Sequence, residues 1–247
     1  MYSIVKDGIT KSLLSLYLHC GKAFYYRTQL LLAKKPDLKM IVGIYGHKML
    51  EIGKLPSVKE GKFVQIVTHG ILKVIIPAYH LYWGASKGQK EYIFDVSHNG
   101  IRMRGKIDKI DKSITDYKFK ARFDNEEGKI ANSIDGLFYC TAMNKRVFTL
   151  DCLKVPALKF DKVPDFEKYA NDIQNNPGDF FIRPNAEYTE DDISLFSSEL
   201  DEYHKQINSK NFTRNLSACW HCDYLKLCIT GDKSGLCKQN LFTELEE

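Results

Sequence analysis

Four cysteines constrain how the two ends of this chain can be arranged. Cys219, Cys222 and Cys228 are spaced C-x2-C-x5-C near the C-terminus, and Cys20 lies almost two hundred residues upstream. Soft thiolates at this spacing are typical ligands of zinc or of an iron–sulfur cluster. A centre shared by all four would close a very long loop and remove much of the entropy of the unfolded chain. We therefore expect the N- and C-terminal regions to lie side by side.

The three-plus-one arrangement of these cysteines favours a 4Fe-4S cluster, because structural zinc more often uses two pairs of ligands. Zinc stays open as an alternative. In a local zinc site, either His221 or Cys237 could take the place of Cys20. Cys140 and Cys152 fall in a predicted helix and a predicted strand, so we assign both to the hydrophobic core.

The size and charge of the chain suit one globular domain with a polyanionic partner. The 247 residues carry a net charge of +5, from 36 basic and 31 acidic side chains. We expect a single domain over 1–247, with N-terminal helices in 1–60, a catalytic core in 90–155 and a C-terminal helix with the cysteines in 189–247. A mild basic excess is compatible with nucleic acid but does not establish it.

No apolar run reaches the roughly 18 residues that a membrane helix needs. The longest candidate, Ile71 to Ala78, is interrupted by Lys73 and Pro77, and the N-terminus has no signal-peptide pattern. We therefore predict a cytoplasmic protein, prokaryotic or viral, that does not contact a membrane. In such a reducing compartment a cysteine cluster is more often a metal site than a set of disulfides.

The pattern of apolar residues predicts a mixed α/β fold. Helices are expected at Lys11–Leu32, Leu38–Ile52, Ile130–Asn144 and Thr189 to about Ile207, and strands at Tyr92–Val96, Ile101–Ile110, Ser113–Lys118 and Arg146–Leu153. Asn99-Gly100 is a strong signal for a hairpin turn, and Asp111-Lys112 is a second short connection. Thr189 and Asp192 have the spacing of a helix cap. The segment Val64 to Ile76 fits either a helix or a strand.

The strongest candidate for a catalytic site lies on two of these strands. Asp108 lies on the second strand of the meander and Asp116 on the third, so a tight turn brings both carboxylates toward one point. Mg²⁺ and Mn²⁺ prefer such oxygen ligands. Lys118 is two residues after Asp116 and faces the same side of the strand. Its ammonium could orient an attacking water and stabilise charge on a phosphate.

One histidine has a setting that suits a metal ligand. His47 and Glu51 are four residues apart on a predicted helix and so share a face, just after Gly43-Ile-Tyr-Gly46. A neutral imidazole there could complete the coordination of the metal. The alternative is an ordinary His–Glu pair on a helix surface.

Taken together, these residues resemble the RecB-like branch of the PD-(D/E)XK nuclease superfamily, specifically its Cas4-like and AddB-like iron–sulfur members. Ser12 to Arg27 resembles the N-terminal helix with the first cluster cysteine, and Gly43 to Glu51 the segment with the metal-binding histidine. Gly105-x-Ile-Asp108 and Asp116-Tyr-Lys118 resemble the two signature motifs. Cys219, Cys222 and Cys228 resemble the C-terminal cysteine triplet.

The resemblance implies an αβββαβ restriction-endonuclease-like core that hydrolyses DNA with Mg²⁺ or Mn²⁺. It makes His47, Asp108, Asp116 and the backbone carbonyl of Tyr117 metal ligands, and it makes Lys118 the residue that positions water. It also makes Cys20, Cys219, Cys222 and Cys228 the ligands of the iron–sulfur cluster. One departure stands out: the family often has Gln-x3-Tyr on the following helix, whereas this chain has Asp135 before Tyr139.

The leading hypothesis is an iron–sulfur DNA nuclease that acts on single strands or free ends. Such an enzyme would serve recombination, repair, phage replication or CRISPR-adaptation-like processing, with a helicase, recombinase or integrase as partner, since no ATP-binding motif is present. Tyr139, Lys120 and Arg122 are candidate DNA contacts. Two alternatives stay open: an inactive DNA-binding or assembly subunit, and a zinc-stapled nucleic-acid-binding protein.

Overall fold

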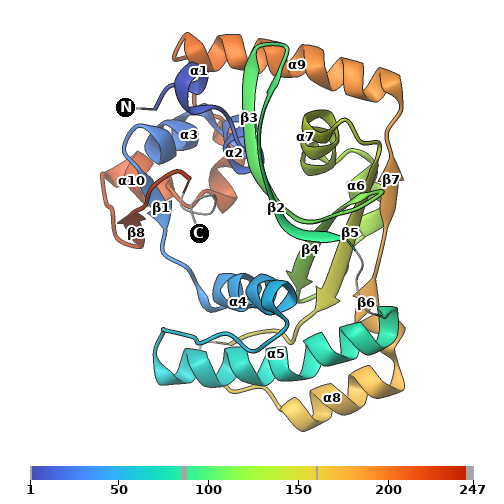
Figure 1. The fold of residues 1–247 in the computed structure, drawn as a ribbon. Helices are drawn as coiled ribbons and strands as arrows, with labels where there is room; N and C mark the ends of the chain where they lie inside the picture. Colours follow the sequence, from blue (N-terminus) through green and yellow to red (C-terminus); the bar gives the residue numbers. More distant parts are fainter. Residues whose placement is uncertain (1, 85–87, 160, 243–247) are drawn as a thin grey trace.

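A six-stranded mixed sheet forms the centre of the molecule (Figure 1). The computed structural model describes residues 2–84, 88–159 and 161–242. The strands are β2 (Gln89–His98), β3 (Ile101–Ile110), β4 (Ile114–Lys120), β5 (Val147–Lys154) and β6 (Phe181–Ile182), in that spatial order, with β7 (Asn185–Glu187) also paired to β5. Only β4 and β5 pair in parallel; the other pairs are antiparallel. The predicted mixed α/β fold is confirmed.

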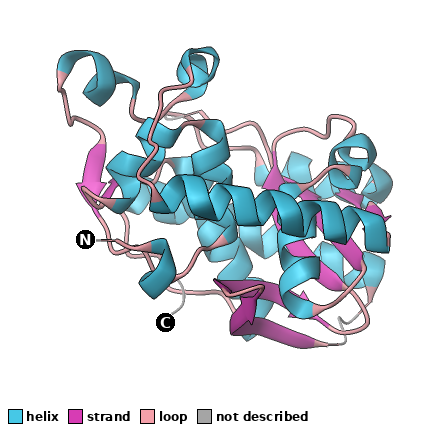
Figure 2. Ribbon diagram, turned by 90° about the horizontal axis from the view of Figure 1, so that it is seen from above, coloured by secondary structure: helices cyan, strands magenta, loops and turns pink. Residues whose placement is uncertain are grey.

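Helices cover both faces of this sheet. One face packs against α7 (Ile134–Met143), α9 (Glu190–Asn208) and the N-terminal helices α1 (Ile4–Asp7), α2 (Lys11–His19) and α3 (Gly21–Thr28). The other face packs against α4 (Leu38–Ile52), α5 (Lys62–Trp83) and α8 (Phe166–Asn175), which is followed by the short helix η1 (Pro177–Asp179). Seen from above, α9 lies nearest to the viewer, across the rest of the fold (Figure 2).

Strand β4 supplies residues to both layers because its side chains alternate. Ile114 lies in the core on the α7 side, whereas Tyr117 and Phe119 pack with α4 and α5 on the other side. The intervening Asp116 and Lys118 therefore point toward the α7 side. The two cysteines assigned to the core from sequence, Cys140 and Cys152, are both fully buried.

Most of the predicted strands and turns are confirmed. β3 has the predicted bounds, while β2 extends beyond Tyr92–Val96 at both ends. Asn99 and Gly100 both have positive φ, 50° and 80°, as a tight hairpin turn requires. Thr189 and Asp192 form a reciprocal capping box, and α9 ends one residue after the predicted Ile207.

Two predicted helices are in fact interrupted. Cys20 has an extended backbone, so α2 stops at His19 and α3 starts at Gly21; the chain then leaves the helix for β1 (Leu32–Lys34). The segment Ile130–Asn144 is likewise divided, because Ser133 caps α7 after the short α6 (Glu126–Ala131). The undecided segment Val64 to Ile76 is helical, within α5.

Strands β3 and β4 stay paired over only a short length. Their register joins Ile110 to Ile114 and Lys109 to Thr115, after which β3 continues in contact with β2 alone. The long β2–β3 hairpin curves away beside α7 (Figure 1). Ile9, just before α2, bridges to Met103 farther along β3. This separation opens space between β3 and β4 where the candidate catalytic residues lie.

The two ends of the chain are joined by backbone pairing, and the predicted cluster cysteines lie in the same region. β1 pairs with β8 (Leu236–Lys238) in a small antiparallel sheet, and Arg27 donates to the carbonyls of Gln239 and Asn240. The cysteine triplet lies on η2 (Leu216–His221), on the residue after it, and on α10 (Leu225–Thr230). The expectation that the ends meet is confirmed, and the additional sheet was not predicted.

Helix α5 corrects one expectation about membranes. Its 22 residues make it long and apolar enough to cross a bilayer by length and composition alone, despite Lys73 and Pro77. Yet Val67, Ile71, Leu72 and Ile75 are fully buried against α4 and α8. A core helix of a globular domain passes the same test, so α5 is weak evidence for a membrane span.

Candidate active site

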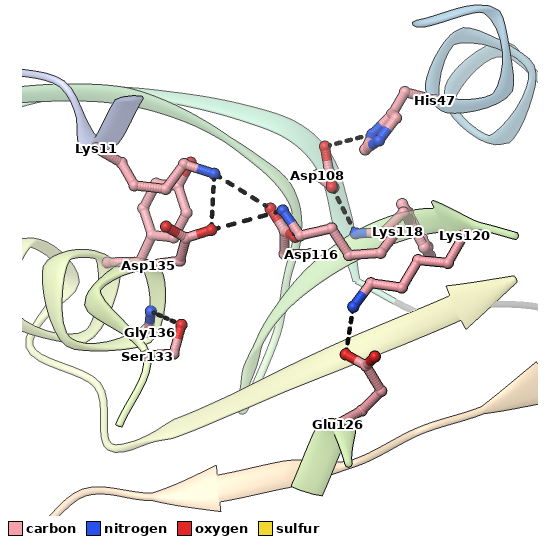
Figure 3. A network of polar contacts seen from close by, with 12 residues as sticks. Lys11, His47, Asp108, Asp116, Lys118, Lys120, Glu126, Ser133, Asp135 and Gly136 are labelled. Carbon is pink, nitrogen blue, oxygen red and sulfur yellow. Dashed lines mark hydrogen bonds and ion pairs between the residues drawn. The ribbon is translucent and has the colours of Figure 1, made fainter. Parts of the chain in front are cut away.

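Asp108 connects the two strands where their backbone pairing ends (Figure 3). Its Oδ2 accepts a hydrogen bond from the backbone N–H of Tyr117 at 2.7 Å, and its Oδ1 lies 3.0 Å from Nδ1 of His47 on α4. Burial would lower the pKa of His47, but the Asp108 carboxylate outweighs it and raises that pKa. The carboxylate therefore links β3, β4 and α4 at one point.

Asp116 and Lys118 lie together on the same side of β4, as their spacing predicts. The Lys118 Nζ is 2.6 Å from Asp116 Oδ2. That oxygen is buried and has no hydrogen bond of acceptable geometry from any described residue, so the contact is an ion pair alone. Burial would raise the pKa of Asp116, but the ammonium groups of Lys118 and Lys11 hold it below its usual value. Asp116 is thus kept ionised and available.

The structure adds Lys11 and Asp135 to this group. Lys11 Nζ lies 3.0 Å from Asp135 Oδ2 and 3.9 Å from Asp116 Oδ1, and Lys118 Nζ is 3.5 Å from the same oxygen of Asp135. Figure 3 shows both ammonium groups converging on Asp135. Asp135 stands where the family often has a glutamine, and Lys11 was not predicted to belong to the site. The sequence contained one signal for Lys11. A lysine in the first turn of a helix interacts unfavourably with the helix dipole, so a carboxylate is expected nearby to compensate it.

The three candidate DNA contacts have other partners in this structure. Lys120 forms an ion pair with the buried carboxylate of Glu126, and Arg122 lies 3.1 Å from Asp124 with 82% of its side chain exposed. Tyr139 is only 6% exposed and donates its hydroxyl to the carbonyl of Lys106 at 3.2 Å. Of the three, Arg122 is the most accessible, and their contact with DNA stays a prediction.

A groove of about 430 Å³ reaches this group of residues from the side of the N-terminal helices. It is lined on one side by Lys11 and Leu16 of α2, and on the other by Gly105 and Lys106 of β3 and by Tyr139. It extends past α4 to Asp223 and Tyr224, close to the cysteine triplet. Lys11, which lies within ion-pair distance of Asp116, and the paired ends of the chain therefore border one groove.

Comparison with protein families identifies this arrangement. Residues 9–229 match the family model described as the PD-(D/E)XK nuclease superfamily. The chain belongs to the PD-(D/E)XK nuclease superfamily. The match spans the candidate catalytic residues and the four predicted cluster cysteines, from Lys11 to Cys228, so this PD-(D/E)XK chain carries the family pattern over most of its length.

A solved structure has the same fold as this PD-(D/E)XK chain. A crystal structure of a "putative exonuclease" from Eubacterium rectale superposes with a TM-score of 0.57 and 13% sequence identity, covering 90% of this chain and 88% of the other. At that identity the similarity establishes the fold alone. No curated protein matches the chain in sequence.

The residues of this PD-(D/E)XK site suit a hard divalent cation. Asp108 and Asp116 offer carboxylate oxygens, and the buried Oδ2 of Asp116 lacks a hydrogen bond within the described residues. The imidazole of His47 lies against Oδ1 of Asp108 and the ammonium of Lys118 against that same Oδ2 of Asp116, and no three His, Cys, Asp or Glu among the described residues are arranged to hold a metal ion. Binding would therefore require His47 and Lys118 to move aside from the carboxylates, which their half-exposed side chains permit.

The four predicted cluster cysteines surround one small cavity. Cys20, Cys219, Cys222 and Cys228 all line a space of about 20 Å³, together with Tyr26 and Arg214. His221 and Cys237 are not among the described residues that line it. Burial and the neighbouring Cys20 and Cys219 raise the pKa of the Cys222 thiol. The fold thus brings together exactly the four cysteines of the family pattern, and what they bind stays a prediction.

Proposed function

We propose that this protein is a metal-dependent DNA nuclease that hydrolyses phosphodiester bonds in single strands or at free ends. The observation that carries the proposal is the convergence of Asp108, from the diverging β3, on Asp116 and Lys118 of β4. Paired carboxylates with an adjacent ammonium on the same face are the group that metal-assisted phosphoryl transfer requires. Membership of a nuclease superfamily supports the same chemistry.

In this proposal, Asp108, Asp116, His47 and the carbonyl of Tyr117 would hold Mg²⁺ or Mn²⁺. A bound divalent cation would supply Lewis-acid activation of water and would neutralise charge on the phosphate. Asp108 is oriented for this role by the N–H of Tyr117, and Asp116 by its burial under Lys118. Hydrolysis of the P–O3′ bond would leave a 5′-phosphate and a 3′-hydroxyl, as the family resemblance implies.

Lys118 would act on the phosphate and on the attacking water. Its pKa is raised, because the Asp116 carboxylate outweighs the effect of burial, so the group stays a cation at neutral pH. A fixed ammonium near the phosphorus can stabilise the charge that grows on the non-bridging oxygens. The DNA strand would reach it along the groove beside Lys11 and Lys106.

We also propose that Cys20, Cys219, Cys222 and Cys228 hold a 4Fe-4S cluster, with zinc as the alternative. Support comes from the four thiols that line one cavity and from the three-plus-one spacing of these cysteines. Four sulfurs around one zinc would lie only about 3.8 Å apart, given a Zn–S distance of about 2.3 Å. A cubane cluster is larger, and iron, unlike zinc, would colour the protein.

The proposed chemistry also suggests the partner protein, the compartment and the processes in which this nuclease would act. A nuclease without a motor would work with a helicase, recombinase or integrase, and the reducing cytoplasm of a prokaryote or of a virus-infected cell would suit thiolate ligation. Recombination, repair, phage replication and CRISPR-adaptation-like processing all present such DNA ends.

The decisive test is cleavage of single-stranded DNA labelled at the 5′ or 3′ end, using protein purified without oxygen and supplied with Mn²⁺ or Mg²⁺. Asp116→Ala should remove cleavage. Asp172→Ala, an exposed aspartate on α8, is the matched control and should cut normally. If the wild-type protein binds the DNA without cutting it, the inactive DNA-binding subunit becomes the better description.

A further inference from the structure

Lys11 lies where a DNA phosphate would have to pass. It lines the groove, and its ammonium is within ion-pair distance of both Asp116 and Asp135. The same ammonium lies 5.7 Å from the centre of the Tyr139 ring. Tyr139 is on α7, the helix that in the family often carries a glutamine and a tyrosine. Only 18% of the Lys11 side chain is exposed. It is therefore part of the site wall, unlike a solvated surface lysine.

The backbone around Lys11 is fixed by the diverging strand. The N–H of Ile9 donates to Arg102 at 2.8 Å, and the N–H of Arg104 donates to Ile9 at 2.9 Å, so this segment pairs with the edge of β3. The Thr10 hydroxyl then caps α2 by accepting from the N–H of Leu13 at 3.3 Å. Because both contacts flank Lys11, its position is set by the same strand that carries Asp108.

The carboxylates of the site would repel a phosphate, and Lys11 offsets part of their charge. Three carboxylates gather here, those of Asp108, Asp116 and Asp135, and a phosphodiester would add another negative charge. Asp135 stands where a neutral glutamine is common, which increases the repulsion that a phosphate meets. Lys11 offsets this extra carboxylate from a different element and faces the groove.

We propose that Lys11 is a substrate-binding residue whose ammonium contacts a backbone phosphate in the groove, beside the scissile one. Asp135 is a positioning residue that holds the ammonium groups of Lys11 and Lys118 at a fixed spacing. This inference rests on the proposed nuclease function and assigns a residue of this chain that the signature motifs do not include.

The opposing explanation is that Lys11 only balances the charge of Asp135. The two explanations differ in what happens when both residues are neutralised together. If Lys11 only neutralises the charge of Asp135, the Lys11→Met/Asp135→Asn double variant should recover normal DNA binding. If Lys11 contacts phosphate, the double variant keeps the binding defect because the cation is still missing.

The test is the salt dependence of binding to a fluorescein-labelled single-stranded oligonucleotide, measured by anisotropy in EDTA so that no cleavage occurs. Loss of one phosphate contact should reduce the slope of log K against log salt by about 0.7. Lys11→Met should show that reduction and bind about tenfold more weakly at low salt. Lys11→Arg should retain the slope, and the exposed Lys73→Met on α5 should match the wild type.

Steady-state cleavage provides a second measure. Lys11→Met should raise KM more than it lowers kcat, whereas Asp135→Asn should lower kcat with KM unchanged or reduced. The double variant also covers the case in which Lys11→Met alone fails to fold, since it removes both charges of the pair. A slope equal to that of Lys73→Met would overturn the inference while wild-type cleavage still supported the nuclease. Absence of both binding and cleavage in the wild type would overturn both proposals.

Discussion

The candidate catalytic residues and the cysteines differ in what holds them in place. Asp108 is fixed between His47 and the N–H of Tyr117, and Asp116 between Lys118 and Lys11, all by contacts within the chain. These residues lie on or beside a sheet whose two faces are both covered by helices. The catalytic geometry is therefore a property of the folded chain itself.

The cysteine triplet has much weaker support. None of the side chains of η2 and α10, all of which the structure describes, is fully buried, and Trp220 between two of the cysteines is 88% exposed. The Cys219 thiol donates only a weak hydrogen bond, to the carbonyl of Asn215 at 3.8 Å. We therefore predict that η2 and α10 depend for their order on a group bound by the cysteines, whereas the candidate catalytic site does not.

The largest effect is expected at Asp108, where catalysis and structure can be separated. Both Asp108→Asn and Asp108→Ala should reduce cleavage about a thousandfold, since each removes the charge that the metal needs. Asn still offers an oxygen to the N–H of Tyr117, so it should fold with near-normal stability. Ala leaves that N–H without its acceptor and should lower the free energy of unfolding by about 1–3 kcal/mol.

Cleavage assays and urea denaturation on the metal-free proteins would measure the two effects. Equal stability of the Asn and Ala variants would mean that the carboxylate does not bridge the strands. Retained cleavage in Asp108→Asn would remove Asp108 from the catalytic group.

A second prediction concerns the cysteine end. Cys20→Ser should abolish the visible absorption of the purified protein and expose the segment from η2 to α10 to limited proteolysis, because the bound group is lost. The catalytic contacts are remote from it and should persist. Cys237→Ser is the matched control: its side chain is in β8 opposite Ala33, and it is not among the described residues lining the cavity.

Iron and zinc analysis beside the absorption spectrum would show which metal is lost. If Cys237→Ser lost metal as fully as Cys20→Ser, the ligand set would be wrong. If neither variant changed in metal content, the dependence of this segment on a bound group would have to be given up.

A third prediction tests whether Lys120 serves structure or DNA. Its partner Glu126 is buried, so Lys120→Met should leave that carboxylate with Lys129, 3.7 Å away, as its remaining ion-pair partner and lower the free energy of unfolding by about 2 kcal/mol. Arg122→Met removes an exposed cation and should change stability by less than about 0.5 kcal/mol. Thermal unfolding would compare them, and a DNA-binding defect confined to Arg122→Met would assign the contact to Arg122.

The same pair predicts a pH dependence. Burial would raise the pKa of Glu126, but the hydrogen bond from Lys120 holds it below its ordinary value of 4.5. A carboxyl with a lowered pKa in the folded state contributes stability above pH 4.5, and that contribution is lost as pH falls through the lowered value. Glu126→Gln should therefore show a flatter loss of stability in acid. If the stability of Glu126→Gln fell as steeply with decreasing pH as that of the wild type, this account would be contradicted.

The sequence predicted the parts of the site that depend on local pattern. Asp108, the tight turn and Asp116-x-Lys118 lie within one hairpin, so alternation alone places them on strands that meet. His47 follows from helical spacing on α4 in the same way. Apolar periodicity does not indicate a change of direction at one residue, such as Cys20. The helix predicted at Lys11–Leu32 was therefore too long.

Contacts between distant segments were beyond local pattern. Lys11 and Asp135 meet across 124 residues of sequence, and their meeting depends on β3 leaving β4 so that Ile9 can pair with its edge. The pairing of β1 with β8 depends likewise on two short strands, of three residues each, that have no pattern of their own. The strongly amphipathic α8 was overlooked, although it buries Tyr169 and Ile173 against α5.

The smallest predicted effect compares two glycines on the helix that carries His47. Gly46 faces β4 so closely that a Cβ atom would lie 2.3 Å from Cζ of Phe119, whereas a Cβ at Gly43 would meet no described atom within 4 Å. Gly46→Ala should therefore push α4 away from the sheet and lower the free energy of unfolding by about 1–3 kcal/mol. Gly43→Ala should raise it by about 0.5–1 kcal/mol, since alanine favours a helix interior.

The two variants also test how the catalytic group is maintained. Phe119 contacts both Gly46 and His47, with ring centroids of Phe119 and His47 5.7 Å apart, so displacing α4 should move the imidazole off Asp108. Gly46→Ala should then lose cleavage in proportion to the shift, while Gly43→Ala keeps full activity and gains stability. Chemical denaturation and cleavage rates measured on the same samples give both readouts. Equal stability of the two variants would show that the Phe119 ring yields, and that the distance between α4 and β4 is not what fixes His47.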